Sequence, residues 1–124
     1  MARVTGIGGI FFKADDPDDL YAWYERHLGL RRAPHGSVTF RWQDDHDGKG
    51  ETHFSIFPAG TTYFDPGHAP FMINFRVDNL DVLLQQLEAA GVEVDPNREE
   101  GEWGKFAWVM DPAGHRIELW EPPE

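Results

Sequence analysis

The sequence places one carboxylate, Glu118, between two apolar residues in a segment that alternates like a β-strand. Ile117 and Leu119 flank it in residues 111–120, and the DPAG at the start of this segment has the composition of a tight turn. Successive side chains of a strand point to opposite faces, so Glu118 lies opposite the face that carries Ile117 and Leu119. A carboxylate there is either ordinary solvated surface or a group that binds a ligand, an ion or a proton.

The predicted strands, that of Glu118 included, carry reactive and aromatic side chains on the same face as Glu118. These side chains are Phe11, Lys13, His53, Ser55, Phe57, Met72, Asn74, Arg76, Arg116 and Trp120. A solvated sheet face rarely holds so many large apolar groups, and a dry core rarely holds lysine, arginine and glutamate together. A concave face that binds a small molecule accounts for both, whereas two sheets packed face to face with charges at their edges is the alternative.

Glu118 is therefore the candidate catalytic residue. If Lys13, Arg76 or Arg116 pairs with it, its pKa falls, and if it stands alone among aromatic rings, its pKa rises toward that of a useful general acid or base. Several aromatic side chains could stack on a flat ligand, although core packing is the default for any aromatic residue; they are Trp42, Tyr63, Phe64, Trp103, Phe106 and Trp108. The candidate substrate-binding residues are Phe11, Lys13, His53, Phe57, Met72, Asn74, Arg76, Trp103 and Trp120.

The sequence contains the start and end signals of two helices. Asp16 can cap a helix that starts at Pro17, and Gly29 can end it. A second helix follows residues 71–77, with Asp78 or Asn79 as its cap, an apolar stripe and an end at Gly91. The stripe is formed by Leu80, Leu83, Leu84 and Leu87.

These signals repeat along the chain. The segment FKAD at 12–15 matches FRVD at 75–78 with an offset of 75 − 12 = 63, and the two helix-ending glycines differ by 91 − 29 = 62. Three strand candidates follow each helix, at residues 30–33, 37–43 and 52–57 in the first half and at 92–94, 105–110 and 116–121 in the second. The sequence therefore predicts the order strand, helix, three strands twice.

The connections are rich in turn residues. The acidic segment DDHDGKGE at 44–51 lacks the residue spacing of a calcium-binding loop. Its composition predicts a hairpin turn instead. Residues 58–70 read as a long surface loop, of the kind that often borders a binding site. Glycines within the first strand, in GIGG at 6–9, indicate that another group approaches the backbone closely.

Composition excludes several classes of function. The net charge of −11 disfavours binding to nucleic acid or to anionic membranes, and the absence of cysteine excludes disulfides and thiolate sites. The apolar run at residues 7–12 is too short for a signal peptide core or a membrane span. We expect a single cytoplasmic domain with no nucleic-acid or membrane partner.

Three stretches resemble the glyoxalase, bleomycin-resistance and extradiol-dioxygenase superfamily, also called the vicinal oxygen chelate superfamily. They are DPDDLYAWYERHLGLR from Asp16, INFRVDNLDVLLQQLEAAGVEV from Ile73 and FAWVMDPAGHRIELWEP from Phe106. The resemblance implies one α+β glyoxalase-like domain over residues 1–124, built of two tandem βαβββ modules, about 1–58 and 71–124, with a linker loop at about 59–70. It further implies an open cupped mixed sheet with helices on its outer face, usually in a homodimer.

Metal-dependent members of this superfamily hold one divalent ion in the cup. The resemblance places the ligand positions at Gly9, at His53 or Ser55, at Met72 and at Glu118. Glycine has no donor and a thioether suits copper(I) rather than zinc, nickel, iron or manganese. We therefore expect no cofactor and no family metal centre, with a divalent ion at Glu118 and His53 as the alternative.

The leading functional prediction is a protein like those that confer bleomycin resistance, which binds a small polar-aromatic molecule in the cup without a metal. The alternative is a metal-dependent lyase, isomerase or dioxygenase, similar to lactoylglutathione lyase, that uses Glu118 and His53. A third possibility is an interaction module whose cup stays empty. The fold accommodates thiol adducts, catechols and antibiotics, so the sequence leaves the ligand open.

Overall fold

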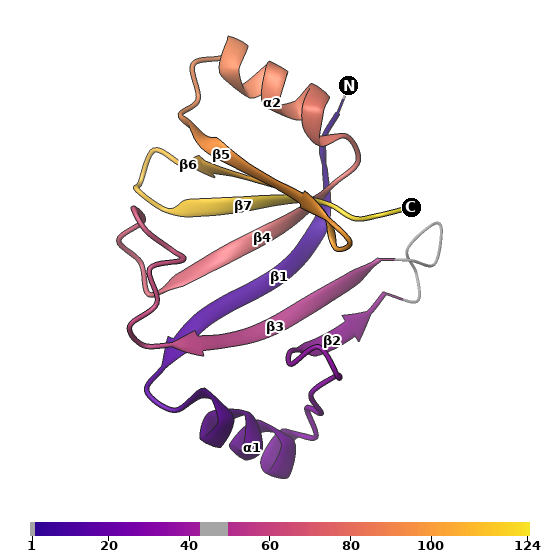
Figure 1. Ribbon diagram of the computed structural model, residues 1–124, viewed down its shortest axis with the longest axis vertical. Helices are drawn as coiled ribbons and strands as arrows, with labels where there is room; N and C mark the ends of the chain where they lie inside the picture. The colour runs from indigo at the N-terminus through magenta and orange to yellow at the C-terminus, as the bar shows by residue number, and fades with distance from the viewer. Residues whose placement is uncertain (1, 43–49) are drawn as a thin grey trace.

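A single open sheet of seven strands forms the body of the protein, with one helix near each end (Figure 1). The computed structural model describes residues 2–42 and 50–124, so most of the turn predicted at 44–51 lies outside the described residues. The elements are β1 (Val4–Ala14), α1 (Pro17–Leu28), β2 (Val38–Arg41), β3 (Glu51–Pro58), β4 (Phe71–Val77), α2 (Leu80–Ala89), β5 (Val94–Gly101), β6 (Gly104–Met110) and β7 (Arg116–Glu121).

The order of strands across the sheet is β2-β3-β1-β4-β7-β6-β5. The antiparallel pair β1–β4 joins the two halves at the centre of the sheet. In each half the first strand lies parallel to the last, as β1 to β3 and β4 to β7, and the intervening helix makes this connection possible. The expected α+β fold with an open, cupped mixed sheet is confirmed.

The two helices begin and end where the sequence predicts. The Asp16 carboxylate accepts a hydrogen bond from the Asp19 amide at 3.1 Å, and the Asn79 side chain accepts one from the Val82 amide at 3.1 Å. Gly29 takes a left-handed conformation with φ of 72° directly after α1. The apolar face of each helix packs on one face of the sheet in its own cluster of buried residues, to which α1 contributes Tyr21 and α2 contributes Leu84.

The prediction of a strand at residues 30–33 is wrong. The backbone there closes a local turn instead, in which the Ala33 amide donates to the Ser37 carbonyl at 2.7 Å and the Gly36 amide donates to the Ala33 carbonyl at 2.9 Å. Pro34 and the positive φ of Gly36, 105°, are typical of such a turn. The counterpart in the second half, predicted at residues 92–94, shares only Val94 with β5, which continues to Gly101 and pairs with β6. The sheet is therefore built of three strands from the first half and four from the second.

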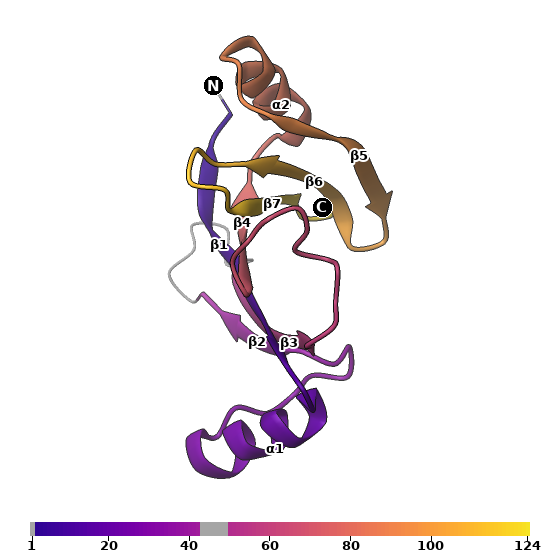
Figure 2. The ribbon, with the colours of Figure 1, turned by 90° about the vertical axis from the view of Figure 1, so that its left-hand side faces the viewer.

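The loop of residues 59–70 packs against the face of the sheet opposite the helix-covered clusters. Figure 2 shows this loop standing off the sheet between β3 and β4. Phe64 from the loop is almost fully buried against Met72 and Trp108, with Tyr63 and Phe57 beside them. The loop thereby covers one end of the concave face and leaves the other end open.

No helix among the described residues is long and apolar enough to cross a membrane.

Candidate functional site

A cavity of about 620 Å³ opens on the uncovered part of the concave face. Both halves of the chain contribute to its wall. Seven of the side chains predicted from the sequence line it, namely Phe11, His53, Asn74, Arg76, Trp103, Glu118 and Trp120. The strand alternation therefore brings residues that are more than a hundred positions apart in sequence into one cup.

Three predicted substrate-binding residues lie outside this wall. Met72 is fully buried beside Phe64, and the Phe57 ring lies 5.2 Å from the Phe64 ring. The Lys13 ammonium lies 5.4 Å from the centre of the same ring. The three side chains lie under or beside the 59–70 loop, so their place is at the covered end of the concave face rather than in the cavity.

Glu118, on β7, lies at the base of the cavity and is 2% exposed. Its Oε1 accepts hydrogen bonds from the Tyr63 hydroxyl and, at 3.0 Å, from the Trp108 indole N–H. Its Oε2 accepts one from the Asn74 amide at 2.6 Å. Asn74 reaches it because β4 and β7 pair with these two residues side by side.

All three groups that donate to Glu118 are neutral. Of the two alternatives that the sequence left open for Glu118, the ion pair with Lys13, Arg76 or Arg116 does not form among the described residues. Arg116 instead donates to the Tyr63 carbonyl at 2.9 Å and lies over the Trp108 ring, with its Cζ 4.7 Å from the ring centre. The sequence could not show this, because Tyr63 reaches the site from the long loop.

Burial dominates the titration of this site. It raises the pKa of Glu118, against the hydrogen bonds from Tyr63, Asn74 and Trp108, which lower it. Burial and the neighbouring carboxylate also raise the pKa of Tyr63, so its hydroxyl keeps its proton and remains a donor. Glu118 is thus a carboxyl group that takes up a proton more readily than an exposed glutamate.

A glycine makes room for this arrangement. A bulge between Ile7 and Gly9 breaks the register of β1, and at Gly8 a Cβ atom would lie 2.2 Å from Asn74 Oδ1 and 2.9 Å from Trp120 Cε3. The close approach that the sequence indicated at the β1 glycines is therefore made by two side chains of the cup. Asn74 Oδ1 itself is buried and has no hydrogen-bond partner among the described residues.

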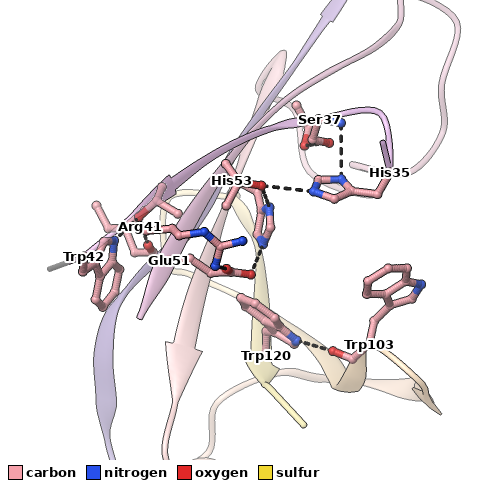
Figure 3. Close-up of polar contacts among 12 residues, drawn as sticks. His35, Ser37, Arg41, Trp42, Glu51, His53, Trp103 and Trp120 are labelled. Carbon is pink, nitrogen blue, oxygen red and sulfur yellow. Dashed lines mark hydrogen bonds and ion pairs between the residues drawn. The ribbon is translucent and has the colours of Figure 1, made fainter. Parts of the chain in front are cut away.

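A chain of hydrogen bonds lies along the wall that the first half contributes (Figure 3). The Thr39 hydroxyl lies 3.0 Å from His35 Nε2 and 3.0 Å from His53 Nδ1. His53 Nε2 lies 2.9 Å from a Glu51 oxygen, and Arg41 donates to the other Glu51 oxygen at 3.0 Å. Both ring nitrogens of His53 are therefore engaged, although the ring faces the cavity.

The proton positions in this chain follow from its ends. His35 Nδ1 faces the Ser37 amide at 3.4 Å, so a neutral His35 carries its proton on Nε2 and donates to Thr39. Thr39 then donates to His53 Nδ1, and His53 donates from Nε2 to Glu51. Burial lowers the pKa of His53, although Glu51 opposes this, and the neutral imidazole of this chain is the favoured form.

Sequence reasoning left open whether His53 or Ser55 faces the cavity, and both do. It did not single out His35, which is exposed and also lines the cavity. The hydrogen bond between Thr39 and His53 could have been predicted from the register of the β2–β3 hairpin, in which these two residues are paired. His35 lies in the turn before β2, which strand alternation does not orient.

Aromatic rings from the second half face these histidines across the cup. The Trp120 ring is stacked on Phe106 at 6.2 Å between ring centres and meets the edge of His53 at 5.6 Å. The Trp120 indole donates to the Trp103 carbonyl at 2.7 Å, and the Trp103 ring lies 6.3 Å from His35. The two halves thus touch at the mouth of the cup.

The side chains at the expected metal positions do not match a set of ion ligands. One row across the sheet runs His53, Gly9, Asn74 and Glu118, so Asn74 rather than Met72 pairs with Glu118. His53 and Glu118 already have protein partners, and Gly9 offers no donor. Within residues 2–42 and 50–124 no three or more His, Asp or Glu side chains gather closely enough to hold a metal ion.

Comparisons with known proteins agree with this fold. Residues 9–120 match the model of the glyoxalase-like domain family. No curated protein matches the chain.

Solved structures are similar over nearly the whole chain. Methylmalonyl-CoA epimerase from Mycobacterium tuberculosis is 19% identical with a TM-score of 0.68, and the match covers 98% of this chain and 90% of that one. A Streptomyces coelicolor methylmalonyl-CoA epimerase in complex with 2-nitronate-propionyl-CoA is 17% identical with a TM-score of 0.73, covering 98% and 100%.

A structure described as NAD-dependent benzaldehyde dehydrogenase from Legionella pneumophila is 14% identical, with a TM-score of 0.60 and coverage of 93% and 98%. At these identities the likeness concerns the fold, which carries different activities. The family match spans most of the sequence, and the chain belongs to the glyoxalase-like domain family of the vicinal oxygen chelate superfamily.

Proposed function

We propose that the protein binds a small polar-aromatic molecule in the cup without a metal ion, and that Glu118 orients this ligand. The observation that carries the proposal is the state of Glu118, whose two oxygens accept three hydrogen bonds from neutral side chains of the protein. A carboxylate held in this way is already positioned without an ion. The surrounding wall supplies apolar area from Trp120, Phe106 and Phe11.

The dimensions of the cup support a small ligand. Its volume, about 620 Å³, lies in the range of drug-sized ligand sites. The similar Streptomyces coelicolor epimerase structure holds 2-nitronate-propionyl-CoA, so a small molecule is what that protein binds. Sequestration of a drug, as in bleomycin resistance, and conversion of a metabolite are both compatible with such a cup.

A metal-dependent lyase, isomerase or dioxygenase is the second candidate. His53 and Glu118 line the same cavity and lie in one cross-strand row, which is the observation in its favour. An ion held there would act as a Lewis acid on a substrate oxygen. It would first have to displace Glu51 or Thr39 from His53.

A thermal-shift screen of chelator-treated protein against aromatic metabolites and antibiotics tests the leading proposal. A ligand that binds only the folded state raises the midpoint of unfolding. We expect hits whose shift disappears in Trp120→Ala and persists in Trp23→Ala, because Trp23 lies on α1, away from the cup. Hits that appear only after a divalent ion is added favour the second candidate, and a complete absence of hits favours an empty interaction module.

We also propose that the protein is a homodimer joined through the middle of its outer face. Ile7, Ile10 and Phe71 lie on the central strands β1 and β4 between the two helices, and each is more than 40% exposed. Such a patch at the centre of a nearly symmetric sheet suits a two-fold contact. Light scattering should give twice the chain mass for the wild type and a single chain mass for Ile10→Asp. A monomeric wild type would contradict the proposal.

A cytoplasmic location stays a prediction from the sequence.

A further inference from the structure

We propose that the cup selects a ligand that carries a protonated amine beside an aromatic ring, with the ammonium group bound between Glu118 and Asn74. This inference rests on the proposed function, because it names the chemical class of the molecule that the cup binds. It follows from hydrogen-bond acceptors at the base of the cavity that lack a matching donor, and from the charges and rings around them.

Two side chains at the base of the cavity offer acceptor capacity. Asn74 donates its amide N–H to Glu118, and its own oxygen, Oδ1, is buried and has no partner among the described residues. Glu118 Oε2 accepts only that one hydrogen bond from the described residues, and a carboxylate oxygen can accept two. A buried acceptor without a donor costs free energy, so a ligand that donates hydrogen bonds to these acceptors removes that cost when it binds.

The charge of the site favours a cationic donor over a neutral one. Glu118 is buried, and each of its three donors is neutral. Burial of a carboxylate without a cation is costly, and an ammonium group that enters the cup offsets this cost through a charge-assisted hydrogen bond. Arg116 lies over the Trp108 ring and pairs with Asp95 at 3.4 Å. Its charge lowers the pKa of Glu118 against the larger effect of burial, but among the described residues it donates no hydrogen bond to that carboxylate.

The cations that line the cavity already have contacts. Arg41 pairs with Glu51 at 3.0 Å, and the Arg76 guanidinium lies 5.9 Å from the centre of the Trp42 ring. The lining also includes the carboxylate of Glu102. Among the described lining residues the carboxylates, Glu51, Glu102 and Glu118, outnumber the guanidinium groups of Arg41 and Arg76, so the lining favours a ligand cation over a ligand anion.

The aromatic wall suits the rest of such a ligand. Trp120 presents its ring to the cavity, held in place by stacking on Phe106 and by the hydrogen bond to the Trp103 carbonyl. Trp103, 61% exposed, stands at the mouth of the cup. Indole rings attract cations to their faces and stack on flat ligands, so both parts of an aromatic amine find a partner here.

Three indole compounds of similar size and different charge test the inference. Isothermal titration of chelator-treated protein at pH 7 with tryptamine, tryptophol and indole-3-acetate compares an ammonium, an alcohol and a carboxylate on one ring system. We expect tryptamine to bind at least about tenfold more tightly than tryptophol, as a charge-assisted hydrogen bond provides, and indole-3-acetate to bind weakest.

Two matched variants assign the preference to Glu118. Glu118→Gln keeps the shape of the side chain and removes its charge, and it should bring tryptamine and tryptophol to within about twofold of each other, since only the charge-assisted contribution is lost. Glu25→Gln removes the same charge from the exposed surface of α1 and should leave the tenfold preference unchanged. An unfolding curve of Glu118→Gln shows whether the comparison is made on folded protein.

The outcomes separate this inference from the proposed function. If tryptophol or indole-3-acetate binds as tightly as tryptamine, the cup binds small molecules and the preference for a cation is wrong. If tryptamine keeps its preference in Glu118→Gln, the assigned site is wrong. If none of the three compounds binds, the inference is overturned, whereas the thermal-shift screen decides the proposed function separately.

Discussion

The two halves of the chain repeat one backbone and give it different chemistry. Phe11 pairs with Ser55 in the first half as Asn74 pairs with Glu118 in the second, and both members are related by the same offset, 74 − 11 = 63 and 118 − 55 = 63. At the same place in the repeat, one half therefore offers a phenyl ring and a hydroxyl and the other an amide and a carboxylate. The fold depends on the pattern that the halves share, and the site depends on where they differ.

The difference extends to the segments around the strands. The first half turns at residues 30–37 where the second half has a strand, and this turn brings His35 next to Thr39. The 59–70 loop lies over one end of the concave face, beside Phe57 of the first half, and it buries Glu118 of the second half under Tyr63. The first half thus presents a hydrogen-bonded histidine wall, and the second half presents a buried acid.

Removal of the ring that joins the halves should give the largest effect. Trp120→Ala leaves a cavity beside Phe106 and removes the hydrogen bond to Trp103, and we expect a loss of about 3–5 kcal/mol in the free energy of unfolding. Trp23→Ala on α1, where the ring is 46% exposed, should cost less than about 1 kcal/mol. Urea unfolding measures both, and equal losses would contradict the place given to Trp120.

Exchange of the residue that distinguishes the halves comes next. Glu118→Ser gives the second half the residue of the first and leaves the donors of Tyr63, Asn74 and Trp108 without a carboxylate, so the free energy of unfolding should fall by about 2–4 kcal/mol. Ser55→Ala removes only the hydrogen bond to Ser37 and should cost about 1 kcal/mol. Chemical unfolding that finds the two costs equal would show that the donors around Glu118 are unimportant.

The stability contributions of Glu118 in the second half and His53 in the first should change in opposite directions with pH. The pKa of Glu118 is raised in the folded state, so its contribution to stability is complete below pH 4.5, the ordinary value, and is lost as the pH rises through the folded pKa. The pKa of His53 is lowered, so its contribution is complete above pH 6.5 and is lost as the pH falls through the folded pKa.

Unfolding across this pH range with two variants checks both signs. Relative to Glu118→Gln, the wild type should lose stability as the pH rises above 4.5, by about 1.4 kcal/mol for each pH unit between the unfolded and folded pKa values. Relative to His53→Gln, it should lose stability as the pH falls below 6.5. A slope of the reverse sign in either comparison would refute the corresponding burial argument.

The helix caps should give the smallest effect and the same effect in both halves. Asp16→Ala and Asn79→Ala each remove a side chain that accepts a backbone amide at 3.1 Å, and each should cost about 1 kcal/mol. Thermal unfolding of the two variants measures this directly. A difference of more than about 1 kcal/mol between them would show that the repeat is less symmetric in its helices than the caps indicate.

The parts of the structure that the sequence predicts are those set by local rules. Caps at Asp16 and Asn79 fix the helices, and alternation places Glu118 and Asn74 on the concave face. The resemblance to the superfamily adds the closure of both halves into one sheet.

Contacts that depend on distant segments escape sequence reasoning. The loop that buries Met72, the approach of Tyr63 to Glu118 and the bulge that turns Gly8 into the cup each depend on tertiary packing. The sequence could not decide between a paired and an unpaired Glu118 for the same reason, because the loop carbonyl of Tyr63 and the ring of Trp108 hold Arg116. A pattern in one segment cannot predict the position of a loop that comes from another.

The central claim is that Glu118 works in this cup without a metal ion. Elemental analysis of tag-free protein, wild type beside Glu118→Gln, tests it most directly. We predict zinc, nickel, iron and manganese well below one atom per chain in both proteins. One atom of any of them per chain in the wild type, lost in Glu118→Gln, would contradict the account.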